Sequence, residues 1–268
     1  MTTTPRRPAL LLVGHGTRRG AGVSECLALA DRVRALAGRR LPGLDVGCGF
    51  IELSPPPISA AVGDLVTAGH RRVVVVPLVL FDAGHAKTDV PASVNLARAD
   101  HPGVAFAYGR GLGVRPNLRE VTAERLEAVV APRLRERTAV LLVGRGTSDP
   151  DANADLHRMA RLVQEGRAWP LVEPAFVGLT EPRVPAGLDR LRALGARRIV
   201  VMPYFLFIGV LTDRIVDQAR AWGDAHPEVQ VVTARHLGAD DRVASLALGR
   251  YDEALAGAVH TVPAGGAR

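Results

Sequence analysis

Short apolar runs alternate with longer amphipathic stretches along the whole chain. The runs rich in Val, Leu and Ile predict strands at residues 9–13, 45–50, 72–77, 104–107, 139–143, 171–177, 197–202 and 229–233. The stretches between them predict helices at residues 22–37, 58–68, 88–99, 116–130, 152–165, 184–194, 211–223 and 240–256. Regular alternation of strand and helix is typical of a parallel sheet with helices on both faces. The pattern therefore predicts an α/β protein.

The second half of the chain repeats the first. The matching segments follow in the same order: LLLVGHGT at 10–17 with VLLVGRGT at 140–147, FIELSPPPI at 50–58 with FVGLTEPRV at 176–184, and GHRRVVVVP at 69–77 with GARRIVVMP at 195–203. Matches of this kind indicate duplication of one ancestral unit. We therefore predict an N-terminal lobe at residues 1–131 and a duplicated C-terminal lobe at residues 139–268, joined by a linker at 132–138.

Two histidines and a glutamate follow predicted strands of the first half. His15 lies just after the first strand, Glu52 follows the second, and His85 lies in the loop after the third. Ligands bind parallel sheets beyond the carboxyl ends of the strands, so these three side chains should meet at one edge. Imidazole nitrogen and carboxylate oxygen together suit a first-row divalent cation. The spacing predicts a metal site.

A histidine after a strand is also often only a structural hydrogen-bonding residue. We interpret the other six histidines in that way, as surface or loop residues: His70, His101, His157, His226, His236 and His260. For His15 and His85 the functional interpretation is favoured because two separate strand ends each carry one. A glutamate directly after an apolar strand, such as Glu52, is costly unless it has a partner.

The repeat provides an internal contrast. Arg145 stands in the second half where the first has His15, and Gly178 stands where the first has Glu52. The second half keeps the framework and lacks the proposed ligands. This predicts one lobe with the metal chemistry and one lobe that binds substrate.

Composition and motifs narrow the class of protein. The formal charge of +7 comes mostly from scattered Arg residues, which reflect an Arg-rich genome or a small anionic partner, and no basic run suggests nucleic acid. No apolar run approaches the roughly 20 residues that span a membrane, and the start shows no signal peptide. Cys26 and Cys48 form no CxxC pair, which favours a reducing cytoplasm. No GxxxxGK[ST] or GxSxG motif is present, so we expect no nucleotide and no tightly bound cofactor.

The chain resembles the class II chelatases, specifically the long, two-domain sirohydrochlorin cobaltochelatases and ferrochelatases. The segments that carry the resemblance are VGHGTR at 13–18, FIELSPPPI at 50–58, VVVVPLVLFDAGHAKTDVP at 73–91, VGRGTSDPDANADL at 143–156 and PYFLFIGVLTDRI at 203–215. The resemblance implies two flavodoxin-like lobes that face each other across a cleft. It also implies that His15 and His85 are the active-site histidine pair and Glu52 the acidic residue. The chain lacks the His-rich tract and the iron–sulfur cysteines of some relatives.

The implied reaction is insertion of a divalent metal into sirohydrochlorin, with the metal as substrate, in cobalamin or siroheme biosynthesis. Co²⁺ is the first expectation and Fe²⁺ the alternative. The implied substrate carries eight carboxylates, for which Arg18, Lys87 and Arg145 are candidate partners. We expect a cytoplasmic monomer.

Two other functions stay open at this point. The first is a carrier that binds the metal or the tetrapyrrole without turnover, which the same ligands would serve. The second is phosphoryl transfer through His15, as in histidine phosphatases. Those enzymes carry Arg directly before the histidine, where this chain has Gly14.

Overall fold

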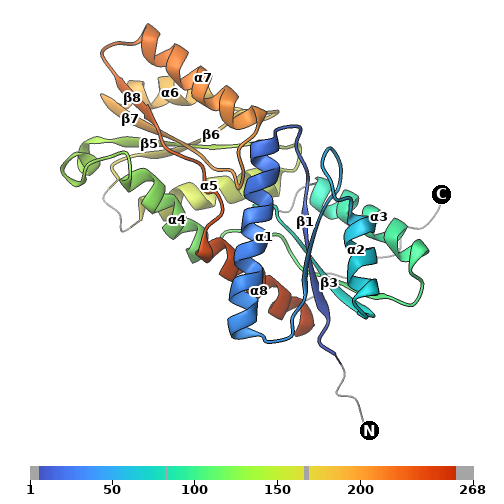
Figure 1. The fold of residues 1–268 in the computed structure, drawn as a ribbon. Coiled ribbons are helices and arrows are strands. Elements are labelled where there is room, and N and C mark those ends of the chain that lie inside the picture. The colour runs from blue at the N-terminus through green and yellow to red at the C-terminus, as the bar shows by residue number, and fades with distance from the viewer. Residues whose placement is uncertain (1–5, 82–83, 166–168, 258–268) are drawn as a thin grey trace.

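The computed structural model describes residues 6–81, 84–165 and 169–257; the side chains of residues 84–89 lie outside the description. The strands are β1 (Ala9–Gly14), β2 (Val46–Phe50), β3 (Arg72–Pro77), β4 (Ala105–Tyr108), β5 (Ala139–Gly144), β6 (Val172–Phe176), β7 (Arg198–Pro203) and β8 (Gln230–Thr233). The α-helices are α1 (Gly20–Arg40), α2 (Ile58–Thr67), α3 (Gly84–Asp100), α4 (Pro116–Glu127), α5 (Pro150–Gln164), α6 (Val184–Ala193), α7 (Val210–Ala225) and α8 (Asp241–Leu255). Every strand and helix predicted from the sequence is present and in order (Figure 1).

The strands form two parallel sheets of four, with the orders β2-β1-β3-β4 and β6-β5-β7-β8. We call the region around the first sheet the first lobe and the region around the second sheet the second lobe. The identical orders confirm the predicted α/β fold and the duplication. The predicted linker forms the 3₁₀ helix η1 (Pro132–Arg137) between them.

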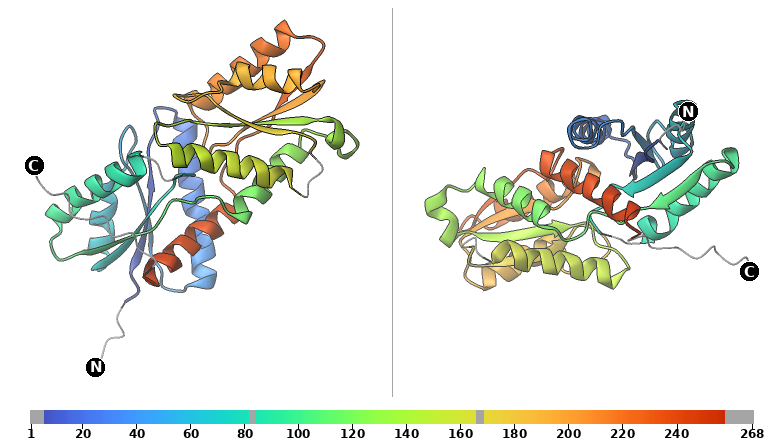
Figure 2. Two further views of the ribbon diagram at one scale, coloured as in Figure 1. Left: turned by 180° about the vertical axis from the view of Figure 1, so that it is seen from behind. Right: turned by 90° about the horizontal axis from the view of Figure 1, so that it is seen from below.

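Both faces of each sheet are buried under helices. In β1, Leu10 and Leu12 belong to the core under α1, and the alternate residues Leu11 and Val13 pack on the α2 side. This two-sided burial explains why the strands read as continuous apolar runs rather than alternating ones. Figure 2 shows the helices on both sides of the sheets.

The last helix of each half crosses to the other lobe. α8 packs against α1 and β3 of the first lobe, and α4 packs against α5 and β7 of the second. The exchange is symmetric: Arg125 of α4 donates to the Leu237 carbonyl at 3.0 Å, and Arg250 of α8 donates to the Leu112 carbonyl at 2.5 Å. The segments 1–131 and 139–268 remain a prediction about the repeat along the chain, because each sheet is completed by a helix from the other half.

The exchange joins the two lobes through one apolar core. The largest buried cluster contains Leu10 and Val74 from the first sheet together with Val140 and Val200 from the second.

Among the described residues, none of the helices combines the length and the apolar character that crossing a bilayer requires.

Candidate functional site

His15 and Glu52 meet at the carboxyl edge of the first sheet. His15 directly follows β1 and Glu52 lies just beyond β2, which is the hydrogen-bonded neighbour of β1. The His15 Nε2 lies 3.3 Å from the Glu52 Oε1, and the two side chains are 36% and 55% exposed. The sequence-predicted pair is therefore brought together at a half-open position that a small ion can reach.

Backbone contacts lock the two loops against each other. Gly14 and His15 accept hydrogen bonds from the N–H groups of Ile51 and Glu52 at 3.0 and 3.1 Å. Gly16 has a φ of +98° and approaches the Glu52 carbonyl so closely that a Cβ would lie 1.8 Å from its oxygen. Only glycine fits such an approach without displacement. The position of Glu52 relative to His15 is thus set by the main chain.

The Ser54 hydroxyl adds a second contact between the two loops. The Thr17 N–H donates to the Ser54 Oγ at 3.0 Å, and the Ser54 hydroxyl donates back to the Thr17 carbonyl at 2.8 Å. The pair closes the same two loops one residue further out, which leaves Arg18 exposed at the tip.

The structure places His85 in the first turn of α3, where the sequence analysis expected a loop. The predicted start at residue 88 was wrong by four residues because Pro91, which lacks an N–H, favours a start close to itself. The side chains of His85 and Lys87 lie outside the described residues, so their predicted roles stay predictions. Among the described side chains, no group of three or more His, Cys, Asp and Glu residues could hold a metal.

The second lobe repeats this scaffold without the ligands. The Val177 N–H donates to the Gly144 carbonyl at 3.0 Å and the Gly178 N–H donates to the Arg145 carbonyl at 2.7 Å, as their counterparts do in the first lobe. Arg145 is exposed at the position of His15, and Gly178 leaves the position of Glu52 without a side chain. This edge presents a fixed cation where the first lobe presents ligands.

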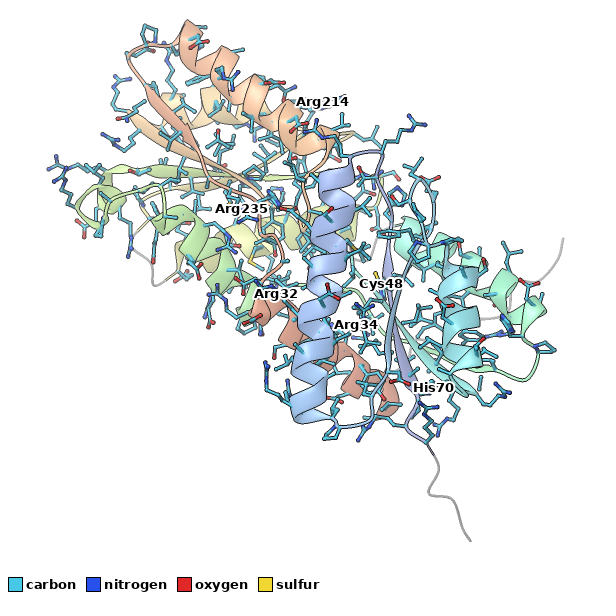
Figure 3. The ribbon with its side chains drawn as sticks, in the orientation of Figure 1. Arg32, Arg34, Cys48, His70, Arg214 and Arg235 are labelled. Carbon is cyan, nitrogen blue, oxygen red and sulfur yellow. The ribbon has the colours of Figure 1, made fainter. Side chains whose placement is uncertain are left out.

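Two histidines differ from their sequence interpretation. His70 and His236 are buried, at 2% and 7% exposure, rather than at the surface. The His70 Nε2 lies 2.6 Å from the Asp45 Oδ2, and the His236 Nε2 lies 2.7 Å from the Glu25 Oε2. A carboxylate partner offsets the free-energy cost of burying an imidazole. Both partners are too distant in sequence to be recognised from local pattern. Figure 3 shows His70 at the opposite end of the sheet from α7.

The two cysteines lie beneath the β1–α1 loop. Cys26 and Cys48 are buried free thiols, and a Cβ on Gly14 would lie 3.1 Å from the Cys26 Sγ. The neighbouring Cys48 thiol and burial both raise the pKa of Cys26 well above its ordinary value. A protonated thiol is a poor metal ligand, so Cys26 packs as a small apolar residue.

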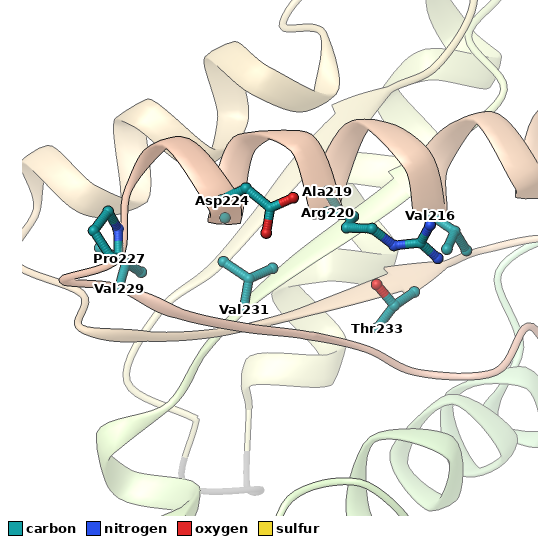
Figure 4. A pocket seen from close by; sticks show the side chains of 9 residues that line it. Val216, Ala219, Arg220, Asp224, Pro227, Val229, Val231 and Thr233 are labelled. Carbon is teal, nitrogen blue, oxygen red and sulfur yellow. The ribbon is translucent and has the colours of Figure 1, made fainter.

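A cavity of about 440 Å³ opens between α7 and the edge strand β8 (Figure 4). It contains none of the predicted site residues. At the corresponding positions the first lobe has the larger Phe106 and Arg98, with the guanidinium 5.6 Å from the ring centre. The second lobe has the smaller Val231 and Gly223 at these positions, and both line the cavity.

Comparison with known proteins agrees with this architecture. The CbiX family matches residues 9–129 and 139–254, one match for each half. The sirohydrochlorin cobaltochelatase of Priestia megaterium is 34% identical over 94% of this chain and 81% of its own length. The sirohydrochlorin ferrochelatase of the same organism is 30% identical over 89% of this chain and 87% of its own length. Among solved structures, SirB from Bacillus subtilis with Fe³⁺ matches with a TM-score of 0.80 and 28% identity, over 94% of this chain and 97% of the other.

Proposed function

The chain belongs to the CbiX family, and we propose that it inserts a divalent metal ion into sirohydrochlorin, a polycarboxylated tetrapyrrole. The observation that carries this proposal is the His15–Glu52 pair at the carboxyl edge of the first sheet. The second lobe repeats the same loops without either ligand, so the pair is a feature of one lobe and not of the fold. The resemblance of both halves to sirohydrochlorin chelatases supports the choice of substrate.

In this proposal His15, Glu52 and His85 hold the metal. Metal–nitrogen and metal–oxygen bonds of about 2.1 Å at a tetrahedral ion separate two ligand atoms by about 3.4 Å. The 3.3 Å between the His15 Nε2 and the Glu52 Oε1 fits one ion shared by both. A third ligand from the start of α3 would leave room on the metal for a pyrrole nitrogen.

Insertion also requires the loss of two pyrrole N–H protons. An imidazole or a carboxylate beside the metal can accept a proton, and general bases of this kind contribute about 10²–10⁴-fold to a rate. Glu52 is half exposed, so a proton that it accepts can pass to water. We propose that His15 and His85 are the main metal ligands and that Glu52 assists them. One of the same three residues accepts the pyrrole protons.

Arg18, Lys87 and Arg145 are the proposed partners of the substrate's carboxylates. Arg18 and Arg145 are exposed on equivalent loops of the two lobes, and neither forms an ion pair with another described residue. Arg binds a carboxylate through two parallel N–H donors, whereas Lys acts as a point charge. Cations on both lobes can therefore hold a flat substrate over the ligands of one lobe.

Co²⁺ is the first candidate for the physiological metal, and Fe²⁺ is the alternative. The cobalt-named relative is more similar in sequence than the iron-named one, yet solved relatives hold either metal. The same three ligands accept both ions, so the chemistry of the donor set favours neither.

The experiment is a turnover assay on the purified protein. Sirohydrochlorin is mixed with Co²⁺, Fe²⁺ or Ni²⁺ in the absence of nucleotide, and the spectral change of the macrocycle is followed. We expect product in large excess over protein, and His15→Ala to abolish it. Product limited to one equivalent would identify a carrier instead. Hydrolysis of a phosphate ester that also depends on His15 would favour phosphoryl transfer.

We further propose that the protein works as a monomer in the cytoplasm. Sedimentation at micromolar concentration gives the oligomeric state, and cell fractionation gives the compartment. A sedimenting mass of twice 28.4 kDa would contradict the monomer.

A further inference from the structure

Glu25 of α1 is bonded to two loops of the second lobe. Its Oε2 accepts a hydrogen bond from the Ile208 N–H at 2.8 Å and lies 2.7 Å from the His236 Nε2. The Oε1 accepts a longer bond from Arg235 at 3.3 Å. Only 21% of the Glu25 side chain is exposed and 9% of the His236 side chain. A charge at this depth is costly without partners, so the contact joins the lobes specifically.

The carboxylate keeps its charge in this position. Burial acts to raise the pKa of Glu25, but the Ile208 N–H and the His236 ring together hold that pKa below its ordinary value. Glu25 is therefore ionised at neutral pH. Charge-assisted bonds to a backbone N–H are stronger than neutral ones, so Ile208 is held firmly.

The segment held by Glu25 lies against the loop that carries His15. A Cβ on Gly22 would lie 2.3 Å from the Ile208 carbonyl oxygen and 2.9 Å from the Thr17 Cγ2. Arg19, at the end of the same loop, forms an ion pair with Asp213 at 2.8 Å. The turn that leads into α7 is thus held beside the metal-site loop at two points, Ile208 and Asp213.

Arg214 follows Asp213 in that turn. It is exposed, and it forms no ion pair within the part of the chain that the structure describes. Figure 3 shows it at the end of α7 that faces the beginning of α1. An unpaired guanidinium whose backbone is anchored on both sides is suited to binding a carboxylate, because the segment loses little further conformational freedom on binding.

We propose that Arg214 binds a carboxylate of the tetrapyrrole from the second lobe, and that Glu25 is the positioning residue that holds Arg214 there. The inference rests on the proposed function. It adds a fourth cation to the three predicted from the sequence, on an element whose first-lobe counterpart begins with Gly84 and His85. It also assigns a role to a buried charge that the metal chemistry does not use.

The experiment compares Arg214→Ala and Glu25→Gln with Arg220→Ala, which removes another exposed Arg of the same helix that forms no ion pair with any described residue. We expect KM for sirohydrochlorin to rise about tenfold in Arg214→Ala, as for loss of one charged hydrogen bond, with kcat nearly kept. Arg214→Lys should recover part of the loss. Glu25→Gln should raise KM as well, and Arg220→Ala should match the wild type.

Two further readouts separate positioning from general destabilisation. Amide hydrogen exchange at Ile208–Asp213 should become faster in Glu25→Gln and stay unchanged in Arg214→Ala. In the double variant, Glu25→Gln should add little to the loss from Arg214→Ala, because both act through one contact. Asp241→Asn, which breaks the Arg32–Asp241 ion pair elsewhere on α1, is the control for the loss of a helix contact.

An unchanged KM in Arg214→Ala, or an equal rise in Arg220→Ala, would overturn the assignment of Arg214. Fully additive losses in the double variant would overturn the role of Glu25. A wild-type protein that neither binds nor metallates sirohydrochlorin would remove the proposed function, and this inference with it. A working wild type with a normal Arg214→Ala variant would remove this inference alone.

Discussion

Gly16→Ala tests whether the close approach of the two first-lobe loops holds the metal pair together. An alanine Cβ would lie 1.8 Å from the Glu52 carbonyl oxygen. A carbon and a carbonyl oxygen in contact need about 3.3 Å, so the loops would have to separate by roughly 1.5 Å. The His15 and Glu52 side chains, now 3.3 Å apart, would move with their loops. The substitution thus displaces the ligands while leaving each of them chemically intact.

The expected effect of Gly16→Ala has two parts, a loss of stability and a loss of rate. Residue 16 has a φ of +98°, and left-handed backbone costs a non-glycine residue about 1–2 kcal/mol. For a protein of this size the backbone strain alone corresponds to a fall in Tm of about 2–8 °C. A misplacement of about 1 Å at a reacting centre costs on the order of 10²-fold in rate. We therefore expect a folded variant with kcat/KM at least about a hundredfold lower.

The duplicated half provides the control. Gly146 is the counterpart of Gly16, with a φ of +79°, and its added Cβ would lie 3.1 Å from the Phe176 Cβ. Gly146→Ala therefore carries a similar backbone strain with only a slight overlap. We expect a smaller loss of Tm than in Gly16→Ala, and nearly normal insertion. Wild-type turnover and metal affinity in Gly16→Ala, or equal inactivation by Gly146→Ala, would refute the argument.

Three further predictions follow from the site and the fold. His15→Ala and His85→Ala should reduce kcat to background, whereas Arg145→Ala should raise KM about tenfold with kcat kept, because Arg neither binds metal nor accepts a proton; equal loss of kcat from His15→Ala and Arg145→Ala would contradict this division. Raising ionic strength at fixed pH should raise KM for sirohydrochlorin while leaving metal affinity nearly constant, because exposed charge pairs are screened over about 8 Å at physiological salt. A KM independent of salt would argue against Arg18, Lys87 and Arg145 as carboxylate partners. The Arg242 side chain lowers the pKa of Asp240 to about 2. A depressed carboxyl pKa stabilises the fold at neutral pH and loses that effect as pH falls from about 4 towards 2, so the stability difference between the wild type and Asp240→Asn, about 1 kcal/mol in denaturant titrations, should shrink over that range.

The sequence predicts well those features that depend on local pattern. β1 and β5 are buried on both faces, so their apolar runs were recognisable, and the repeat located His15 and Arg145 at equivalent strand ends. Glu52 could be predicted beside His15 because adjacent parallel strands end at one edge. These inferences need only periodicity and the order of elements.

Contacts between distant segments could not be predicted in the same way. Glu25 and His236 each look like ordinary polar residues of a helix and a loop, and their pairing follows only from how the lobes pack. Arg214 lies in an amphipathic helix whose sequence gives no reason to prefer it over Arg220. The crossing of α4 and α8 was equally hidden, because an amphipathic helix buries its apolar face equally well on either sheet.

The exchanged helix α8 also bears on how the protein is made. The strands of the first sheet are complete once Tyr108 has been synthesised, but α8, which covers Val74 and Val76 of β3 beside α1, ends only at Leu255. At about 5–20 residues per second, the ribosome needs roughly 7–30 s to deliver the intervening chain. During that interval the nascent first half presents an uncovered apolar face. Such a face is the kind of surface that chaperones bind, so the synthesis of α8 decides when the first half is protected from aggregation.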